Sequence, residues 1–106
     1  MLKTIEDIKE ANESSGYFWF RPDTMRFFNT RLSAKIHPSE KGGAYFVSSE
    51  RAPAGSDGYR PARFYTVRYA ADDGYVSTVG EFQGYWNSRA AHKAAAGYAV
   101  NGHEGQ

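Results

Sequence analysis

Histidines, serines and carboxylates are the residues of this chain that could perform acid–base or nucleophilic chemistry. His37, His92 and His103 fall in a predicted turn, a predicted helix and the C-terminal tail, with no spacing typical of a metal chelate. No serine lies in a nucleophile-elbow motif. The chain has no cysteine, which excludes disulfides and thiolate ligands. We therefore expect no catalytic residues, no metal and no cofactor, and a protein that acts by binding and not as an enzyme.

Two short motifs resemble ligand-binding loops but lack the residues that such loops need. Asp72-Asp73-Gly74 is not followed by the remaining oxygen ligands of a calcium loop and is better explained as a hairpin turn. Gly42-Gly43 has neither the spacing nor the following Lys-Ser/Thr of a phosphate loop. Neither motif indicates a bound ion or nucleotide.

Aromatic and arginine side chains are the better indication of function, because Tyr, Trp and Arg dominate binding hot spots. Aromatic residues make up 16% of the chain. Tyr59 and Arg60 lie in a long predicted loop, and Tyr85 and Trp86 lie in a predicted strand-to-helix corner. These four residues are the predicted partner-binding site. Trp19 and its neighbouring rings are expected to belong to the core instead.

Basic residues support an alternative, in which the protein binds nucleic acid directly. The net charge of +1 gives no global attraction to phosphates, so a local patch would have to supply it. Arg31 and Lys35 share the polar face of the first predicted strand. Further basic side chains surround the third predicted strand and the last helix, and the predicted nucleic-acid-binding residues are Arg63, Arg68, Arg89 and Lys93.

The elements that must position these residues begin with a helix. Thr4 and Asp7 have the spacing of a capping box, and Ser14 to Gly16 are typical of a helix end. The aromatic run 17–20 fits either a buried strand or a loop that covers one end of the core. Pro22-Asp23 fits a turn or the start of a short helix.

Four strands and a second helix follow. Residues 28–36 alternate in a two-residue repeat, which predicts a half-exposed strand with Phe28, Thr30, Leu32, Ala34 and Ile36 on one face. Further strands are predicted over 44–50, 63–69 and 75–82, with Asp73-Gly74 in a hairpin. The last helix begins at Asn87 or Ser88 and ends at Asn101-Gly102. Its small side chains allow it to lie close to the sheet, and the most central are Ala90, Ala94 and Tyr98, flanked by Ala91, Ala95 and Ala99.

The predicted fold is therefore a single α+β domain over residues 1–100, with a flexible tail over 101–106. It has an N-terminal helix, a four-stranded antiparallel meander and an Ala-rich C-terminal helix packed on the sheet. No apolar run is long enough for a membrane span, and the first residues do not resemble a signal peptide. We expect a cytoplasmic protein with no membrane partner, as a monomer or a homodimer.

The stretch 63–100 resembles the C-terminal half of a double-stranded-RNA-binding domain. The order of strand, turn, strand and a helix opening with "NSRAAHKAAAGYA" carries the resemblance. In that family a serine and closely spaced lysines at the helix start contact phosphates, which implies such a role for Arg89 and Lys93. The lysine cluster is reduced to these two residues, and the family's Gly-Pro loop has no counterpart.

A broader set of segments is similar to small proteins of bacteriophages and other bacterial mobile elements. These segments are "DTMRFFNTR", "YFVSSE", "YTVRY" and "TVGEFQGY". The resemblance implies a protein that acts stoichiometrically on a bacterial host protein or protein complex. Anti-CRISPR proteins, which inhibit nucleic-acid-processing defence complexes, are one such class.

Overall fold

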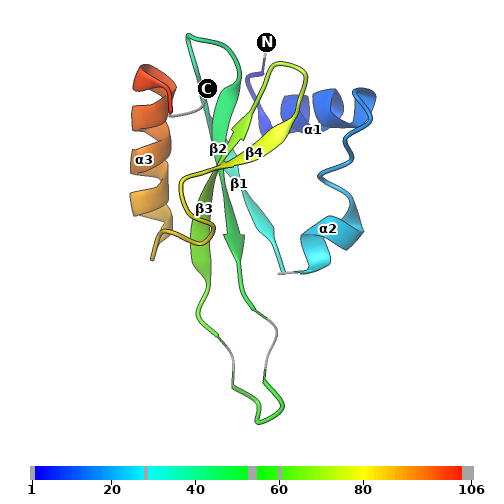
Figure 1. Ribbon diagram of the computed structural model, residues 1–106, viewed down its shortest axis with the longest axis vertical. Helices are drawn as coiled ribbons and strands as arrows, with labels where there is room; N and C mark the ends of the chain where they lie inside the picture. Colours follow the sequence, from blue (N-terminus) through cyan, green and yellow to red (C-terminus); the bar gives the residue numbers. More distant parts are fainter. Residues whose placement is uncertain (1, 28, 53–54, 60, 104–106) are drawn as a thin grey trace.

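Helices cover both faces of a four-stranded antiparallel sheet in the computed structural model, which describes residues 2–27, 29–52, 55–59 and 61–103 (Figure 1). The strands lie side by side in chain order: β1 (Arg31–Pro38), β2 (Ala44–Glu50), β3 (Phe64–Ala70) and β4 (Val76–Val79). On one side of the sheet lie α1 (Ile5–Ser14) and α2 (Pro22–Phe27), and on the other lies α3 (Ser88–Asn101). This confirms the predicted α+β meander with a helix at each end.

Helix α1 begins and ends as its sequence predicts. The Thr4 hydroxyl accepts a hydrogen bond from the Asp7 N–H, and the Asp7 carboxylate accepts one from the Thr4 N–H. These two bonds form the predicted capping box. Gly16 follows the helix with a φ of 81°, a left-handed conformation that glycine adopts without strain. Ile5 and Ile8 are buried in the core that α1 shares with the sheet.

A buried asparagine connects α1 to the predicted hairpin. The Asn12 amide donates a hydrogen bond to the Gly74 carbonyl, and its oxygen accepts one from the Trp19 N–H. The hairpin closes through a bond from the Ala71 N–H to the Tyr75 carbonyl. Gly74 has a φ of 86°, and a Cβ there would lie 2.2 Å from the Asn12 nitrogen. Both the turn and the contact with α1 therefore require glycine at this position.

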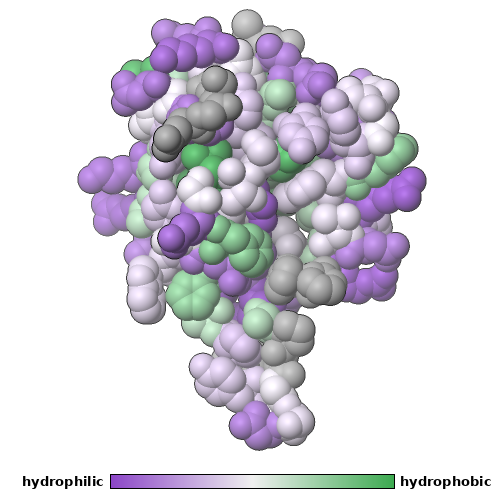
Figure 2. All heavy atoms as spheres, viewed as in Figure 1, coloured by the Kyte–Doolittle hydropathy of each residue, from purple (hydrophilic) through white to green (hydrophobic). Residues whose placement is uncertain are grey.

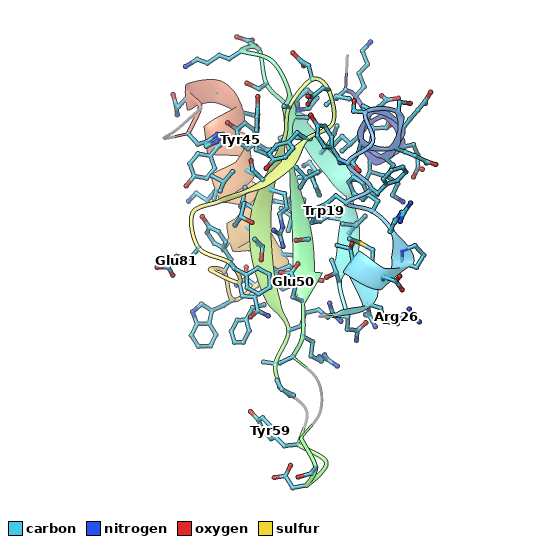
Figure 3. All side chains as sticks on the ribbon, turned by 45° about the vertical axis from the view of Figure 1, so that its right-hand side comes forward. Trp19, Arg26, Tyr45, Glu50, Tyr59 and Glu81 are labelled. Carbon is cyan, nitrogen blue, oxygen red and sulfur yellow. The ribbon has the colours of Figure 1, made fainter. Side chains whose placement is uncertain are left out.

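The central strand β2 is buried along its whole length because both faces of the sheet are covered. Tyr45 lies beside α3, whereas Trp19 lies between the sheet and α2 (Figure 3). The core under α1 contains Ile8, Phe46, Ala70 and Val76. The core under α3 contains Tyr45, Val47, Val67, Val79, Ala91, Ala95 and Ala99.

Strand β1 differs from the regular alternation that the sequence predicts. The strand begins at Arg31, and Phe28 lies outside the described residues. Leu32 and Ile36 pack against the core as expected, but the pairing with β2 is irregular between them. The prediction for Ala34 is wrong, since its side chain is exposed within this irregular segment.

The aromatic run before α2 is a loop and not a strand. Trp19 and Phe20 pack edge to face with ring centroids 4.8 Å apart, and both rings contact Phe46 of β2. Tyr17 and Phe18 are exposed. Of the two interpretations of this run, the loop that covers one end of the core is therefore correct, and Pro22 begins a short helix.

Helix α3 is capped by Asn87, whose side chain accepts a hydrogen bond from the Ala90 N–H. The buried face is centred on Ala91, Ala95 and Ala99, whereas Ala90 is exposed. The sequence prediction, which centred the face on Ala90, Ala94 and Tyr98, is therefore displaced by one position along the helix.

The C-terminal residues of the described chain pack against the sheet. Asn101 belongs to α3, and Gly102 caps the helix. His103 accepts or donates a hydrogen bond of 2.6 Å between its Nδ1 and the Tyr45 hydroxyl, and its ring lies 4.9 Å from that of Tyr69. Ordered packing thus extends beyond the predicted domain end at residue 100, into the segment predicted as a tail.

A buried ion pair links β2 and β3. Glu50 is fully buried, and its Oε2 lies 3.5 Å from Nη2 of Arg68, which is 8% exposed. The Thr66 hydroxyl donates to the other oxygen of Glu50. Arg68 also donates to the hydroxyls of Ser48 and Thr78. Both charges are therefore satisfied by hydrogen bonds on neighbouring strands, as buried charges require.

We expect Arg68→Met to lower the free energy of unfolding by about 3–5 kcal/mol, because it leaves the Glu50 carboxylate buried without its partner. Replacing both residues, as Glu50→Leu with Arg68→Met, should recover much of that loss. Urea denaturation of the purified variants measures both effects. The matched control is Arg26→Met, which breaks a 2.6 Å ion pair with Asp23 at side chains 78% and 88% exposed and should change stability little. Equal losses in Arg68→Met and Arg26→Met would contradict a structural role for the buried pair.

Candidate functional site

A cleft of about 500 Å³ lies between α2 and the sheet. Its lining includes Trp19 from the loop before α2, Met25 from α2, Arg68 from β3 and Phe82 from the segment after β4. We call it the aromatic cleft. Its volume lies within the range of about 300–1,000 Å³ that is typical of ligand-binding clefts. Asp23, Thr24 and Thr30 complete its lining with polar groups.

Arg68 gives the aromatic cleft a cation whose charge is already balanced. Its guanidinium lies 5.2 Å from the Trp19 ring centroid and 5.5 Å from that of Phe82. Aromatic faces attract a guanidinium at such distances. Because Glu50 pairs with the same group, the sheet contributes no net charge to the cleft. The cleft is therefore suited to an apolar or neutral side chain and less to an anion.

The segment between β4 and α3 is fixed to the sheet and presents aromatic rings beside the cleft. The Gln83 N–H donates to the Thr66 hydroxyl, and the Gln83 side chain donates to the Glu50 carbonyl. On either side of this anchor, Phe82 is 42% exposed and Trp86 is 81% exposed. Figure 2 shows apolar side chains exposed on the side of the molecule that faces the viewer, above the projecting loop.

Trp86 and Tyr85, predicted together as partner-binding residues, point to opposite faces of the sheet. The Trp86 ring contacts Phe64, with centroids 5.5 Å apart, on the face of the aromatic cleft. Tyr85 pairs with Tyr65 through two backbone hydrogen bonds, and its ring packs in the core under α3. Burial, with a smaller contribution from Tyr98, raises the pKa of the Tyr85 hydroxyl. Trp86 is thus available to a partner, whereas Tyr85 is half-buried.

Tyr59 lies far from this corner, on the loop between β2 and β3. That loop projects from the end of the sheet (Figures 1 and 3), and Tyr59 is 66% exposed. A bond from the Gly55 N–H to the Tyr59 carbonyl closes its tip, and Asp57 accepts a bond from the Tyr59 N–H. Arg60, predicted as its neighbour in the binding site, lies outside the described residues. Tyr59 and Trp86, predicted to belong to one site, therefore lie on separate surfaces.

The structure does not bring the four predicted nucleic-acid-binding residues together. Arg89 and Lys93 are exposed on α3. Arg68 is buried on the opposite face of the sheet, where it pairs with Glu50. The sheet therefore separates Arg68 from the two basic residues of α3.

Arg63, the fourth of these residues, anchors the base of the long loop. Its Nη1 donates to the carbonyls of Asn29 and Ser49. Burial lowers the pKa of the Arg63 guanidinium, and the nearby charges of Arg31 and Arg51 lower it further. Three arginines thus gather at the start of β1 and the base of the loop, at positions that only partly coincide with the predicted patch.

Two histidines that are far apart in the sequence meet between β1 and α3. His37 Nε2 lies 2.9 Å from His92 Nδ1, and the Ser33 hydroxyl lies 2.9 Å from His92 Nε2. We call this arrangement the Ser33–His92–His37 chain. No spacing rule could have found it, because 55 residues separate the two histidines. Among the described residues, no group of three or more His, Cys, Asp or Glu side chains could hold a metal ion.

The environment keeps both imidazoles neutral near pH 7. Burial lowers the pKa of His37, and the repulsion that a protonated His92 and Lys35 would exert lowers it further. Burial, followed by the charge of Lys35, also lowers the pKa of His92. A hydrogen bond between two imidazole nitrogens needs one of them to accept, which only a neutral ring nitrogen can do.

These shifts predict that the protein loses stability in mild acid. The unfolded histidines have a pKa of about 6.5, so on acidification they take up protons before the folded ones do. The free energy of unfolding should therefore fall as the pH drops from about 7.5 through 6.5 towards the lower folded pKa. Urea denaturation at several pH values gives the free energy of unfolding as a function of pH. This free energy should change less steeply with pH in the double variant His37→Gln/His92→Gln than in the wild type. His103 is present in both proteins, so its contribution cancels in the comparison. Identical pH dependence in the two proteins would therefore show that His37 and His92 do not cause the loss of stability.

Comparison with known proteins places the chain in a family. No helix of the described residues is long and apolar enough to cross a bilayer. No curated protein and no solved structure matches the chain. A family match runs from Thr4, the cap of α1, into α3, and covers the aromatic cleft and the Ser33–His92–His37 chain. On this match over residues 4–96, the chain belongs to the Family of unknown function (DUF7447).

Proposed function

We propose that this protein acts by binding another protein through the aromatic cleft and the adjacent Trp86. The observation that carries the proposal is the 81% exposure of Trp86 on an anchored segment that also supplies one wall of the cleft. A tryptophan held at the surface loses little conformational entropy on binding and buries a large area, which is why such residues are frequent hot spots. The rigid anchor at Gln83 reduces that entropic cost further.

The chemistry of the cleft supports a protein partner. Its aromatic walls can bury one large apolar side chain, and its polar rim residues can bond to the partner's backbone. Arg68, already paired with Glu50, adds no unpaired charge that would select a phosphate. A central apolar pocket within a polar rim is the usual anatomy of a protein–protein interface.

The resemblance of several sequence segments to small phage and mobile-element proteins supports a bacterial host protein as the partner. In this proposal the protein acts stoichiometrically in the host cytoplasm and occupies a surface of a nucleic-acid-processing complex, as anti-CRISPR proteins do. Tyr59 on the projecting loop would supply a second contact at a distance from Trp86.

Direct binding of nucleic acid is a second candidate, favoured by the arginines at the base of the loop. Arg31 and Arg51 lower the pKa of Arg63, so the three like charges repel one another in the free protein. A bound phosphate would relieve this repulsion. Nucleic-acid binding by this cluster would depend steeply on salt, because each neutralised phosphate releases counterions.

Trp86→Ala should weaken binding to the partner by about 30-fold or more, the size of a hot-spot loss of about 2 kcal/mol. The partner is first captured from nuclease-treated bacterial lysate and then purified, so that calorimetry gives the affinity and the stoichiometry. Tyr75→Ala is the matched control, since Tyr75 is 54% exposed in the β3–β4 hairpin at the other end of the sheet.

The outcomes of this experiment distinguish specific binding at the Trp86 surface from non-specific hydrophobic binding. A partner that is retained by Tyr75→Ala and lost by Trp86→Ala supports the proposal. Equal affinity of the wild type and Trp86→Ala for the purified partner would contradict it, as would a capture that depends entirely on intact nucleic acid.

Titration with labelled DNA and RNA at two salt concentrations tests the second candidate. If the arginine cluster binds phosphates, Arg31→Gln should weaken binding at low salt and reduce the dependence of log K on log [salt] by about 1. Lys3→Gln, a change at an exposed residue before α1, is the control and should leave both quantities unchanged. Absence of any binding by the wild type at low salt would eliminate this candidate.

A further inference from the structure

We propose that Ser33 is a nucleophile, with His92 as its general base and His37 as a positioning residue, in a second site between β1 and α3. The Ser33 oxygen lies 2.9 Å from one ring nitrogen of His92, and a nitrogen of His37 lies 2.9 Å from the other. Hydrolytic enzymes activate serine in the same way. The nucleophile is hydrogen-bonded to a base, and a third group orients that base. Nothing in the chemistry of the aromatic cleft requires these contacts.

The irregularity in β1 makes this arrangement possible. Residues four apart in a regular strand are about 13 Å from each other, a separation that a serine and a histidine could bridge through one imidazole only with nearly fully extended side chains. In β1, the four-residue interval from Leu32 to Ile36 lies opposite the two-residue interval from Ser48 to Phe46 of β2. Two residues of a strand span only about 7 Å. The local compression of β1 therefore lets Ser33 and His37 reach the same ring of His92, and irregular strand segments of this kind often re-aim side chains at active sites.

A small pocket of about 240 Å³ adjoins Ser33. Its lining includes Arg31 and Ser49 from the strands, Tyr65 from β3 and Ser88 from the first turn of α3. The volume fits a short acyl group, and Arg31 offers a charge for an anionic substituent. The ligand class that this pocket selects is a small ester carrying a carboxylate or a phosphate.

The hydrogen bonds define the path of the proton. In the reactive tautomer the Ser33 hydroxyl donates to His92 Nε2, and His92 Nδ1–H donates to His37 Nε2. As the serine oxygen bonds to the ester carbonyl carbon, its proton moves to His92 Nε2. The carbon–oxygen bond to the leaving group then breaks, and His92 returns the proton to the departing alkoxide. Water hydrolyses the acyl group by the same route and regenerates Ser33.

The charge state of the histidines agrees with this role. Burial and the charge of Lys35 lower the pKa of His92, so its ring is neutral and can accept a proton at pH 7. His37 is also neutral, and it orients His92 by hydrogen bonding without the negative charge that a carboxylate would supply. Turnover should therefore be slower than in enzymes whose third group is an aspartate.

A fluorophosphonate probe tests the proposal on the unaltered chain. Attack by the Ser33 oxygen on phosphorus expels fluoride, and the serine proton passes to His92. Mass spectrometry of the digested protein should place the phosphonyl adduct on Ser33. His92→Gln should slow labelling about 100-fold or more, the usual contribution of a general base. Ser77→Ala is the control, since Ser77 is a half-buried strand serine outside the pocket, and it should not change the rate.

A single-cysteine variant provides an independent measurement. Because the chain contains no cysteine, Ser33→Cys introduces its only thiol. A neighbouring histidine lowers the pKa of a thiol, so this variant should react with iodoacetamide at pH 6.5 at least about tenfold faster than Ser77→Cys. Adding His92→Gln should remove the difference, and adding His37→Gln should reduce it, as expected for a positioning residue.

The outcomes decide the proposal without reference to the aromatic cleft. Absence of a Ser33 adduct on the wild type overturns it, as does labelling that is unaffected by His92→Gln. Equal alkylation of folded Ser33→Cys and Ser77→Cys also counts against it. If a cysteine variant fails to fold, the fluorophosphonate labelling of the wild type and of His92→Gln decides whether the proposal holds. Because Trp86 lies on the opposite face of the sheet, loss of partner binding and loss of serine reactivity can be observed separately.

Discussion

The pairing of Glu50 with Arg68 is the constraint on which the rest of this structure depends. Both charges lie on the two central strands, where Glu50 is fully buried and Arg68 is only 8% exposed, so water solvates neither charge fully. Their desolvation is tolerated only because hydroxyls on adjacent strands bond to them. The strand register must therefore hold Thr66, Ser48 and Thr78 opposite the pair, and a slip by one residue would move these hydroxyls to the other face.

The same pair explains why the aromatic cleft exists. α1 covers only one end of the sheet face on which it lies, where the sheet side chains are apolar. These side chains include Phe46, Ala70 and Val76. Over the ion pair, the cover consists of the rings of Trp19 and Phe82, which accept a guanidinium against their faces. Two separate rings cover this region less completely than a helix would, and the cleft lies there between the rings, α2 and the sheet.

Local signals in the sequence predict much of this fold. The capping box of α1, the Asp-Gly turn and the asparagine cap of α3 each depend on residues within a few positions of one another, and the structure has all three. Predictions that depend on the far side of the sheet are less successful. Arg68 looks like one of several surface arginines, because nothing near it in the sequence reveals that Glu50 lies across the strand pair. Tyr85 and Trp86 look like one site, although an extended segment sends neighbouring side chains to opposite faces. The Ser33–His92–His37 chain has no local signal, since it needs the irregular β1 and the packing of α3 together.

The buried alanines of α3 have a consequence that reaches beyond packing. Ala91, Ala95 and Ala99 are the buried residues of α3, and their short side chains let the helix lie close to the strands. That height above the sheet also fixes how far the imidazole of His92 must extend to meet an oxygen on one side and a nitrogen on the other. A bulkier residue at these sites would lift the helix and stretch both bonds at once. Substitutions at these alanines are thus limited by the length of the two hydrogen bonds of His92 as well as by the space between helix and sheet.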